Sequence, residues 1–119
     1  QIASDQPAQA AALLDALEAN PAMSRPLRHY LDYHRGRIAL RSGDIPVALA
    51  ALRRAAAGYA ATCDPDYPEF LEVRAALVQA LRAAGEHSEA DALATELIRS
   101  YRALGPAFAP EADALATRP

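Results

Sequence analysis

Three prolines recur at a fixed interval along this chain of 119 residues: Pro26, Pro68 and Pro110 lie 42 positions apart. Gly43 and Gly85 follow the first two prolines at the same distance, 17 positions on. A period of this size is the signature of stacked supersecondary units, each of which buries its apolar face against its neighbours. Such stacks present extended surfaces to other molecules. The sequence therefore predicts a repeat scaffold that holds a partner.

The apolar residues recur at helical spacing throughout, and no stretch alternates apolar and polar residues as a strand does. The loops between predicted helices are about two to eight residues long, and such short loops make consecutive helices antiparallel. The predicted fold class is therefore all-α, with helical hairpins stacked side by side in a single domain, 1–119. The expected units are a partial repeat helix at 5–20, a first repeat at 26–61, a second at 68–104, and the start of a third or a terminal cap at 110–117.

Residues that start or stop helices mark the ends of these units. Asp5 is a candidate N-cap of the first helix. Gly43 and Gly85 suit the left-handed turn that closes one helix before the next begins. Ser88 and Asp91 have the spacing of a capping box at the start of the fifth helix. The first helix carries three leucines on one face: Leu13, Leu14 and Leu17.

Composition narrows the class of protein further. Hydrophobic residues make up 52% of the chain and charged residues 23%, as in soluble globular domains. The net charge of −3 argues against a nucleic-acid partner. No apolar run approaches the roughly 18 residues of a membrane helix, and no signal peptide is evident, so no membrane partner is expected. Because the chain begins at Gln1, we expect a fragment or a processed product; the compartment stays undetermined, with the cytoplasm favoured.

Small residues recur where the two helices of a hairpin must approach closely. Ala48 and Ala90 are 42 positions apart, and Ala39 and Ala55 are candidates for similar contacts. The pattern resembles the tetratricopeptide repeat (TPR), which places small residues at its eighth, twentieth and twenty-seventh positions and often glycine at its fifteenth. Three residues of the second copy fill positions fifteen, twenty and twenty-seven: Gly85, Ala90 and Leu97. Five residues of the first copy fill positions eight, fifteen, twenty, twenty-four and twenty-seven: Gly36, Gly43, Ala48, Leu52 and Ala55.

The 42-residue period is similar to the kinesin-light-chain variety of TPR, which also occurs in multidomain bacterial signalling proteins. The resemblance covers nearly the whole chain and implies a fragment of a right-handed α-solenoid with five to six helices. Three positions that are usually large and apolar depart from the pattern, being Asp32, Arg35 and Arg74. Asp32 and Arg35 lie three residues apart and are expected to pair on the helix surface. The alternative is a plain helical bundle.

In the TPR family the first helix of each repeat lines a concave groove. Carried over residue by residue, the resemblance places eight residues there: Tyr30, Tyr33, Arg37, Arg41, Glu72, Ala75, Gln79 and Arg82. Their helical spacing independently puts each set of four on one stripe. Tyr30 and Tyr33 are expected to anchor a partner, because tyrosine is enriched at interface hot spots. The arginines favour acidic character in that partner. The alternative is that the tyrosines pack against the first helix and the arginines form an ordinary solvated face.

The resemblance implies a protein–protein interaction scaffold, the TPR portion of a larger bacterial signalling or regulatory protein that binds a peptide or a partner domain. The alternative is a structural module that self-associates through uncapped ends or packs on a neighbouring domain of the same protein. An enzyme is not expected, because no nucleophile elbow, phosphate-binding loop or carboxylate pair stands out. His29 and His34 lie about 140° apart around a helix and cannot share one ion. No cofactor, metal or catalytic residue is predicted.

Overall fold

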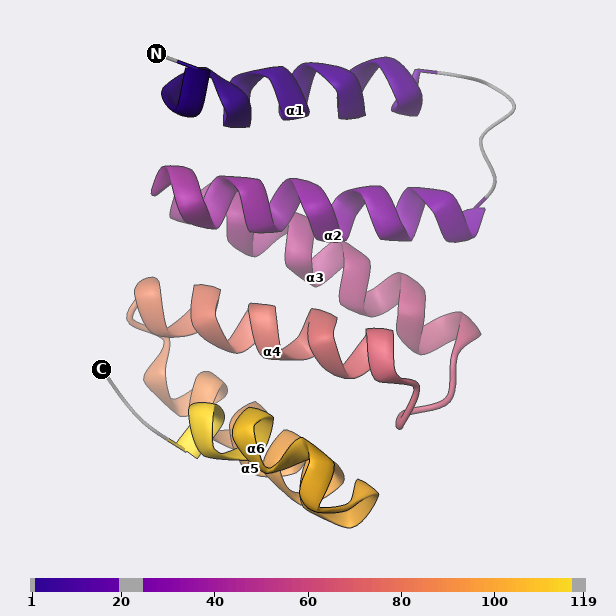
Figure 1. Ribbon diagram of the computed structural model, residues 1–119, viewed down its shortest axis with the longest axis vertical. Coiled ribbons are helices and arrows are strands. Elements are labelled where there is room, and N and C mark those ends of the chain that lie inside the picture. The colour runs from indigo at the N-terminus through magenta and orange to yellow at the C-terminus, as the bar shows by residue number, and fades with distance from the viewer. Residues whose placement is uncertain (1, 20–24, 117–119) are drawn as a thin grey trace.

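Six α-helices and one 3₁₀ turn follow one another in the computed structural model, which describes residues 2–19 and 25–116. Consecutive helices pack side by side from α1 at the top of Figure 1 to α5 and α6 at the bottom. No strand occurs in these residues. This arrangement confirms the predicted all-α class and the stack of helical hairpins. The elements are α1 (Ile2–Glu18), α2 (Arg25–Ser42), α3 (Ile45–Thr62), α4 (Pro68–Ala83), α5 (His87–Leu104), the turn η1 (Pro106–Phe108) and α6 (Ala109–Ala116).

The two glycines of the repeat make the same turn in both hairpins. Gly43 has a φ of 80° and Gly85 a φ of 81°, the left-handed region that an L side chain rarely adopts. The N–H groups of the residues that follow them, Asp44 and Glu86, donate to carbonyls five positions back. These are the hydrogen bonds of a Schellman motif, which satisfies the last carbonyls of α2 and α4. The predicted left-handed turns are therefore confirmed.

Two predicted helix starts are wrong. Helix α1 begins at Ile2, so Asp5 lies inside the helix. Helix α5 begins at His87 with Glu86 as its N-cap, which makes Ser88 the second helical residue. No side-chain hydrogen bond caps this helix, so Ser88 and Asp91 form no capping box. The reason is the Schellman turn at Gly85, because it places the next helix immediately after Glu86.

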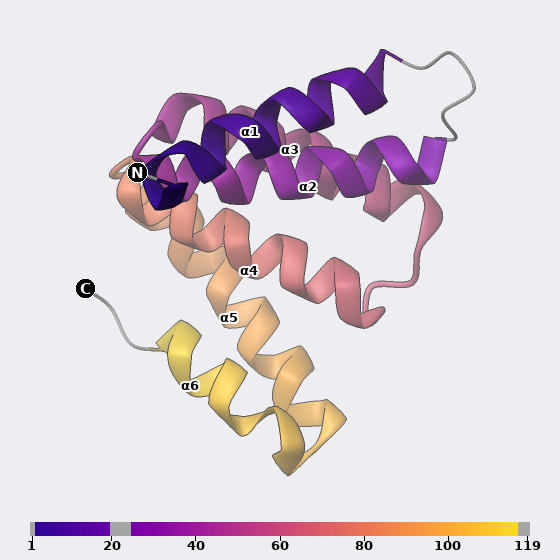
Figure 2. The same cartoon turned by 45° about the horizontal axis from the view of Figure 1, so that its top comes forward.

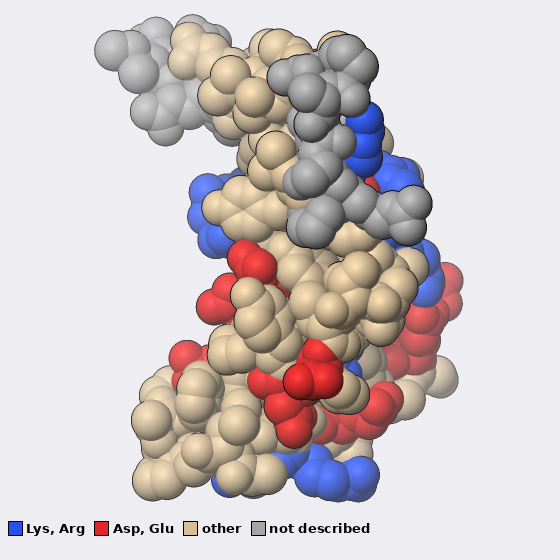
Figure 3. All heavy atoms as spheres, turned by 90° about the vertical axis from the view of Figure 1, so that its right-hand side faces the viewer, with Lys and Arg blue, Asp and Glu red and all other residues tan. Residues whose placement is uncertain are grey.

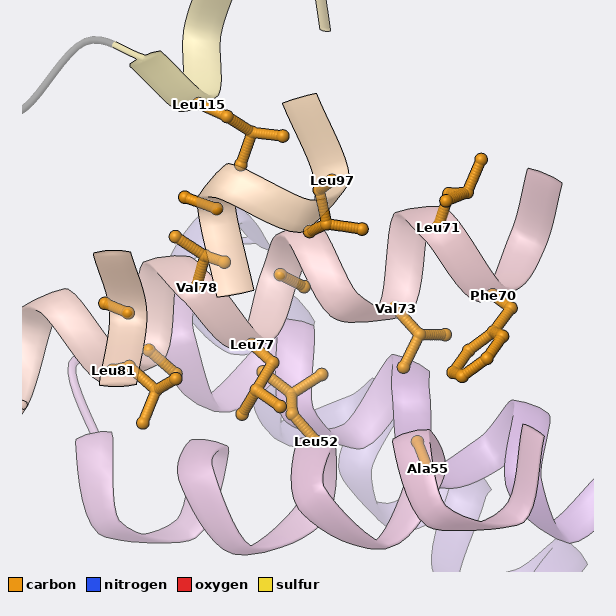
Figure 4. Close-up of a cluster of buried hydrophobic side chains, with 14 of the residues drawn as sticks. Leu52, Ala55, Phe70, Leu71, Val73, Leu77, Val78, Leu81, Leu97 and Leu115 are labelled. Atoms are coloured by element: carbon orange, nitrogen blue, oxygen red, sulfur yellow. The ribbon is translucent and has the colours of Figure 1, made fainter. Parts of the chain in front are cut away.

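Close contact between α2 and α3 holds the first hairpin together. A Cβ atom built at Gly36 would lie 2.5 Å from Leu52 Cγ, so the side chain of Leu52 occupies the space that a side chain at position 36 would need. Ala48 and its counterpart Ala90 are fully buried, as expected for close-contact positions. The core continues from Leu52 through α4 to α5 and α6, where Leu97 is also fully buried (Figure 4).

Helix α1 packs on α2, and Leu14 is the one buried residue among the α1 positions whose burial the structure describes. Of the three leucines on its predicted apolar face, Leu14 is buried, whereas Leu13 is 62% exposed and Leu17 is also exposed. No helix in the described parts of the chain combines the length and the apolar character needed to cross a membrane.

Two charged residues at unusual repeat positions, Asp32 and Arg35, reach neighbouring helices. Arg35 donates to Asp15 of α1 across 2.6 Å, and Asp32 lies 3.5 Å from Arg54 of α3. The predicted pair between Asp32 and Arg35 is therefore wrong, because each side chain points toward a different helix. Two of the three departures from the repeat pattern thus form ion pairs between helices, whereas the third, Arg74, donates to the carbonyl oxygen of Pro65 in the loop before α4.

Candidate binding groove

The helices α2, α4 and α6 line a groove of about 470 Å³. All three helices run from right to left in Figure 1, and Figure 2 shows the same helices from above. In profile the molecule is hollowed on the side that carries these helices (Figure 3). The lining residues come mainly from the three helices: Tyr33, Arg37, Leu40, Arg41, Glu72, Ala75, Ala76, Gln79, Arg82, Tyr101, Glu111, Ala114 and Leu115.

The structure brings together seven of the eight residues that the sequence assigns to the groove. The exception is Tyr30, which is 41% exposed but does not line the groove. Its ring packs edge-on against His34, with ring centroids 4.2 Å apart. The His34 Nε2 atom is buried with no hydrogen-bond partner among the described atoms. Burial, together with the nearby Arg37, lowers the pKa of this histidine.

Two tyrosines form the floor of the groove rather than projecting into it. Tyr33 is only 7% exposed, and the Arg37 guanidinium lies over its ring, 5.5 Å from the centroid. Burial raises the pKa of the Tyr33 phenol. Tyr101 of α5 is also buried, and burial with the nearby carboxylates of Glu72 and Glu111 raises its pKa to about 12. The two phenols of the floor are therefore uncharged at neutral pH, with the carboxylates of Glu72 and Glu111 close to Tyr101.

Arg82 lines the groove but is engaged within the chain. Its side chain is 12% exposed, its Nη2 donates to the carbonyl oxygen of Leu115 across 2.8 Å, and Asp91 lies 4.0 Å away. The last carbonyls of a helix lack partners inside the helix, so this bond satisfies one of them and ties α6 to α4. Arg82 thus builds the wall of the groove, whereas Arg41, Glu72 and Gln79 are exposed to an incoming molecule.

The groove residues from α5 and α6 were missed by the sequence reasoning, which took its sites only from α2 and α4. A signal for them was present. Pro110 and Glu111 repeat Pro68 and Glu69 at the period of 42, and Ala114 stands at the same repeat position as Glu72. The period itself therefore pointed to α6 as the next wall of the groove.

A second hollow of about 440 Å³ lies between α3, α4 and α5. Its floor contains Phe70, with the Arg74 guanidinium over the ring at 4.2 Å from the centroid. At its edge Arg53 of α3 makes two hydrogen bonds to the Glu89 carboxylate of α5, at 2.7 and 3.0 Å. This hollow is more apolar than the groove, and its charged rim is already paired at Arg53.

Exposed charged side chains, Arg41 and Glu72 among them, stand at the rim of the groove, where they can pair with groups of a bound molecule. Across residues 2–19 and 25–116, no group of three His, Cys, Asp or Glu side chains lies close enough to hold a metal ion. Comparison with protein-family models, with curated proteins and with solved structures finds no match.

Proposed function

We propose that this chain is a TPR-like interaction module that binds a peptide or a partner domain in the groove of α2, α4 and α6. One observation carries the proposal: α2, α4 and α6, which begin successive units of the 42-residue period, line the same groove. The rim offers exposed Arg41, Glu72 and Gln79, which are free to pair without disturbing the core. A module of this kind would serve as the recognition part of a larger bacterial signalling or regulatory protein.

A double charge reversal, Arg37→Glu with Arg41→Glu, tests the proposal. Neither arginine has an ion-pair partner among the described residues, and the variant loses only the contact of Arg37 with Tyr33, so it should keep its fold. We expect the native domain to enrich defined sequences from a phage-displayed library of random peptides. The reversed variant should bind these peptides at least about tenfold more weakly, because acidic groups of a peptide would then face the introduced carboxylates.

The matched control is Arg28→Glu with Arg99→Glu, which changes the net charge equally at exposed positions outside the groove. Circular dichroism establishes that both variants are folded. Equal loss of binding in the control and the groove variant would contradict the proposal, because a general charge effect would then explain the result.

A structural role is the second candidate, and the exposed apolar surface of α1 and α2 favours it. Leu13, Leu17 and Tyr30 are all exposed on these two neighbouring helices. Exposed large apolar side chains mark a site that another chain or domain covers when they lie together in one patch. Sedimentation equilibrium separates the two roles. If the chain self-associates through this surface, Leu13→Glu with Leu17→Glu should abolish the association. A native protein that stays monomeric at all concentrations would rule out self-association.

A further inference from the structure

We propose that the segment bound in the groove is dipolar, with an acidic group at one end and a lysine or arginine at the other. This inference rests on the proposed function and deepens it. The groove carries its charges in two separate places. The arginines lie in the second half of α2, whereas the carboxylates lie in the first halves of α4 and α6. Since the three helices run in the same direction (Figure 1), the groove has a basic end and an acidic end.

The acidic end consists of Glu72 and Glu111, both exposed. Neither carboxylate has an ion-pair partner among the described residues, and both lie near the buried ring of Tyr101. Two exposed carboxylates without a partner suit a cationic side chain, because each can pair with its charge.

The basic end consists of Arg37 and Arg41, which can pair with a carboxylate through planar guanidinium donors. The third groove arginine, Arg82, is held by Leu115 and Asp91 and contributes little exposed surface. An acidic partner is therefore favoured at this end alone. A wholly acidic segment would place its remaining charge against Glu72 and Glu111, where like charges repel.

Helix geometry sets the spacing of the two charges in the partner. Glu72 occupies the repeat position of Tyr30, and Arg37 and Arg41 lie seven and eleven residues beyond that position on α2. At about 1.5 Å per helical residue, the two ends are separated by roughly 10–16 Å along the helix direction. An extended segment rises about 3.3 Å per residue, so its opposite charges should lie about three to five residues apart.

Four synthetic peptides of equal length and with the same apolar centre test this inference. One is dipolar, one has acidic residues at both ends, one has basic residues at both ends, and one is neutral. Chemical-shift titrations in two-dimensional NMR, carried to millimolar peptide, measure the affinity and locate the perturbed residues. We expect the dipolar peptide to bind native protein about fivefold to tenfold more tightly than either single-sign peptide, the factor expected for two exposed ion pairs.

Charge-reversed proteins should exchange these preferences. Glu72→Arg with Glu111→Arg makes both ends basic, so the wholly acidic peptide should become the tightest ligand. Arg37→Glu with Arg41→Glu should instead select the wholly basic peptide. The control Arg28→Glu with Arg99→Glu changes the net charge outside the groove and should still prefer the dipolar peptide.

The outcomes separate the inference from the function on which it rests. If the wholly acidic peptide binds the groove of native protein with the same affinity as the dipolar peptide, the inference is overturned and the binding function stands. If the control protein no longer prefers the dipolar peptide, the net charge of the protein determines peptide preference, and the inference is again overturned. If none of the peptides perturbs groove residues, the proposed function fails and the inference fails with it.

Discussion

Replacing Leu97 with alanine should lower the free energy of unfolding by about 3 kcal/mol, within the range of roughly 2–5 kcal/mol for buried leucines. Leu97 is fully buried in α5 and faces α4 and α6 near Leu71 and Leu115 (Figure 4). The cost has two parts, since the substitution loses buried apolar surface and leaves a cavity that surrounding helices fill only in part. Urea denaturation followed by circular dichroism measures the effect, and the melting temperature should fall by about 10 °C or more.

The same substitution at Leu104 is the matched control. Leu104 ends the same helix but is 42% exposed, so its truncation creates no closed cavity. We expect Leu104→Ala to change stability by less than about 1 kcal/mol. Equal losses from the two variants would mean that α5 does not present Leu97 to the core, and would contradict the observed packing of α4, α5 and α6.

The repeat period predicted the turns of this fold better than local capping signals did. Gly43 and Gly85 share a position in the repeat, and they make the same left-handed turn because glycine is the residue that tolerates it. The capping box at Ser88 was a purely local pattern. It failed because the turn at Gly85 had already set the start of α5 at His87. The start of α5 is determined by the preceding turn, which a capping-box motif within residues 88–91 does not describe.

For the candidate groove, the sequence predicted which side of a helix a residue faces but not how deeply that residue is buried. Helical spacing placed Tyr30 and Tyr33 on one side of α2, but it could not say that Tyr33 lies in the floor of the groove while Tyr30 does not line it. Depth depends on how far the neighbouring helix overlaps each residue, which is a property of packing. The engagement of Arg82 is likewise invisible in the sequence, since its partner Leu115 belongs to a helix 33 positions away.

The substitution of Gly36 by leucine should destabilise the first hairpin by about 3 kcal/mol, near the upper end of the usual cost of overpacking. A Cβ at this position would lie 2.5 Å from Leu52 Cγ and 2.7 Å from Leu52 Cδ2. Leu52 is fully buried, so it has no free space to move into. The better helix propensity of leucine offsets at most about 1 kcal/mol of this cost. Ala50→Leu is the control, because Ala50 lies exposed on α3 and should accept leucine within about 0.5 kcal/mol.

A double-mutant cycle with Leu52→Ala then identifies the contact. Leu52→Ala alone should cost about 2–5 kcal/mol, because it leaves a cavity. In the double variant the leucine at position 36 occupies part of the space that Leu52 vacates, so each change relieves the defect of the other. The combined loss should therefore be smaller than the sum of the single losses by about 1–3 kcal/mol, as expected for side chains in direct contact. Additive losses, within about 0.5 kcal/mol, would show that Gly36 does not face Leu52 and that α2 and α3 pack in another register.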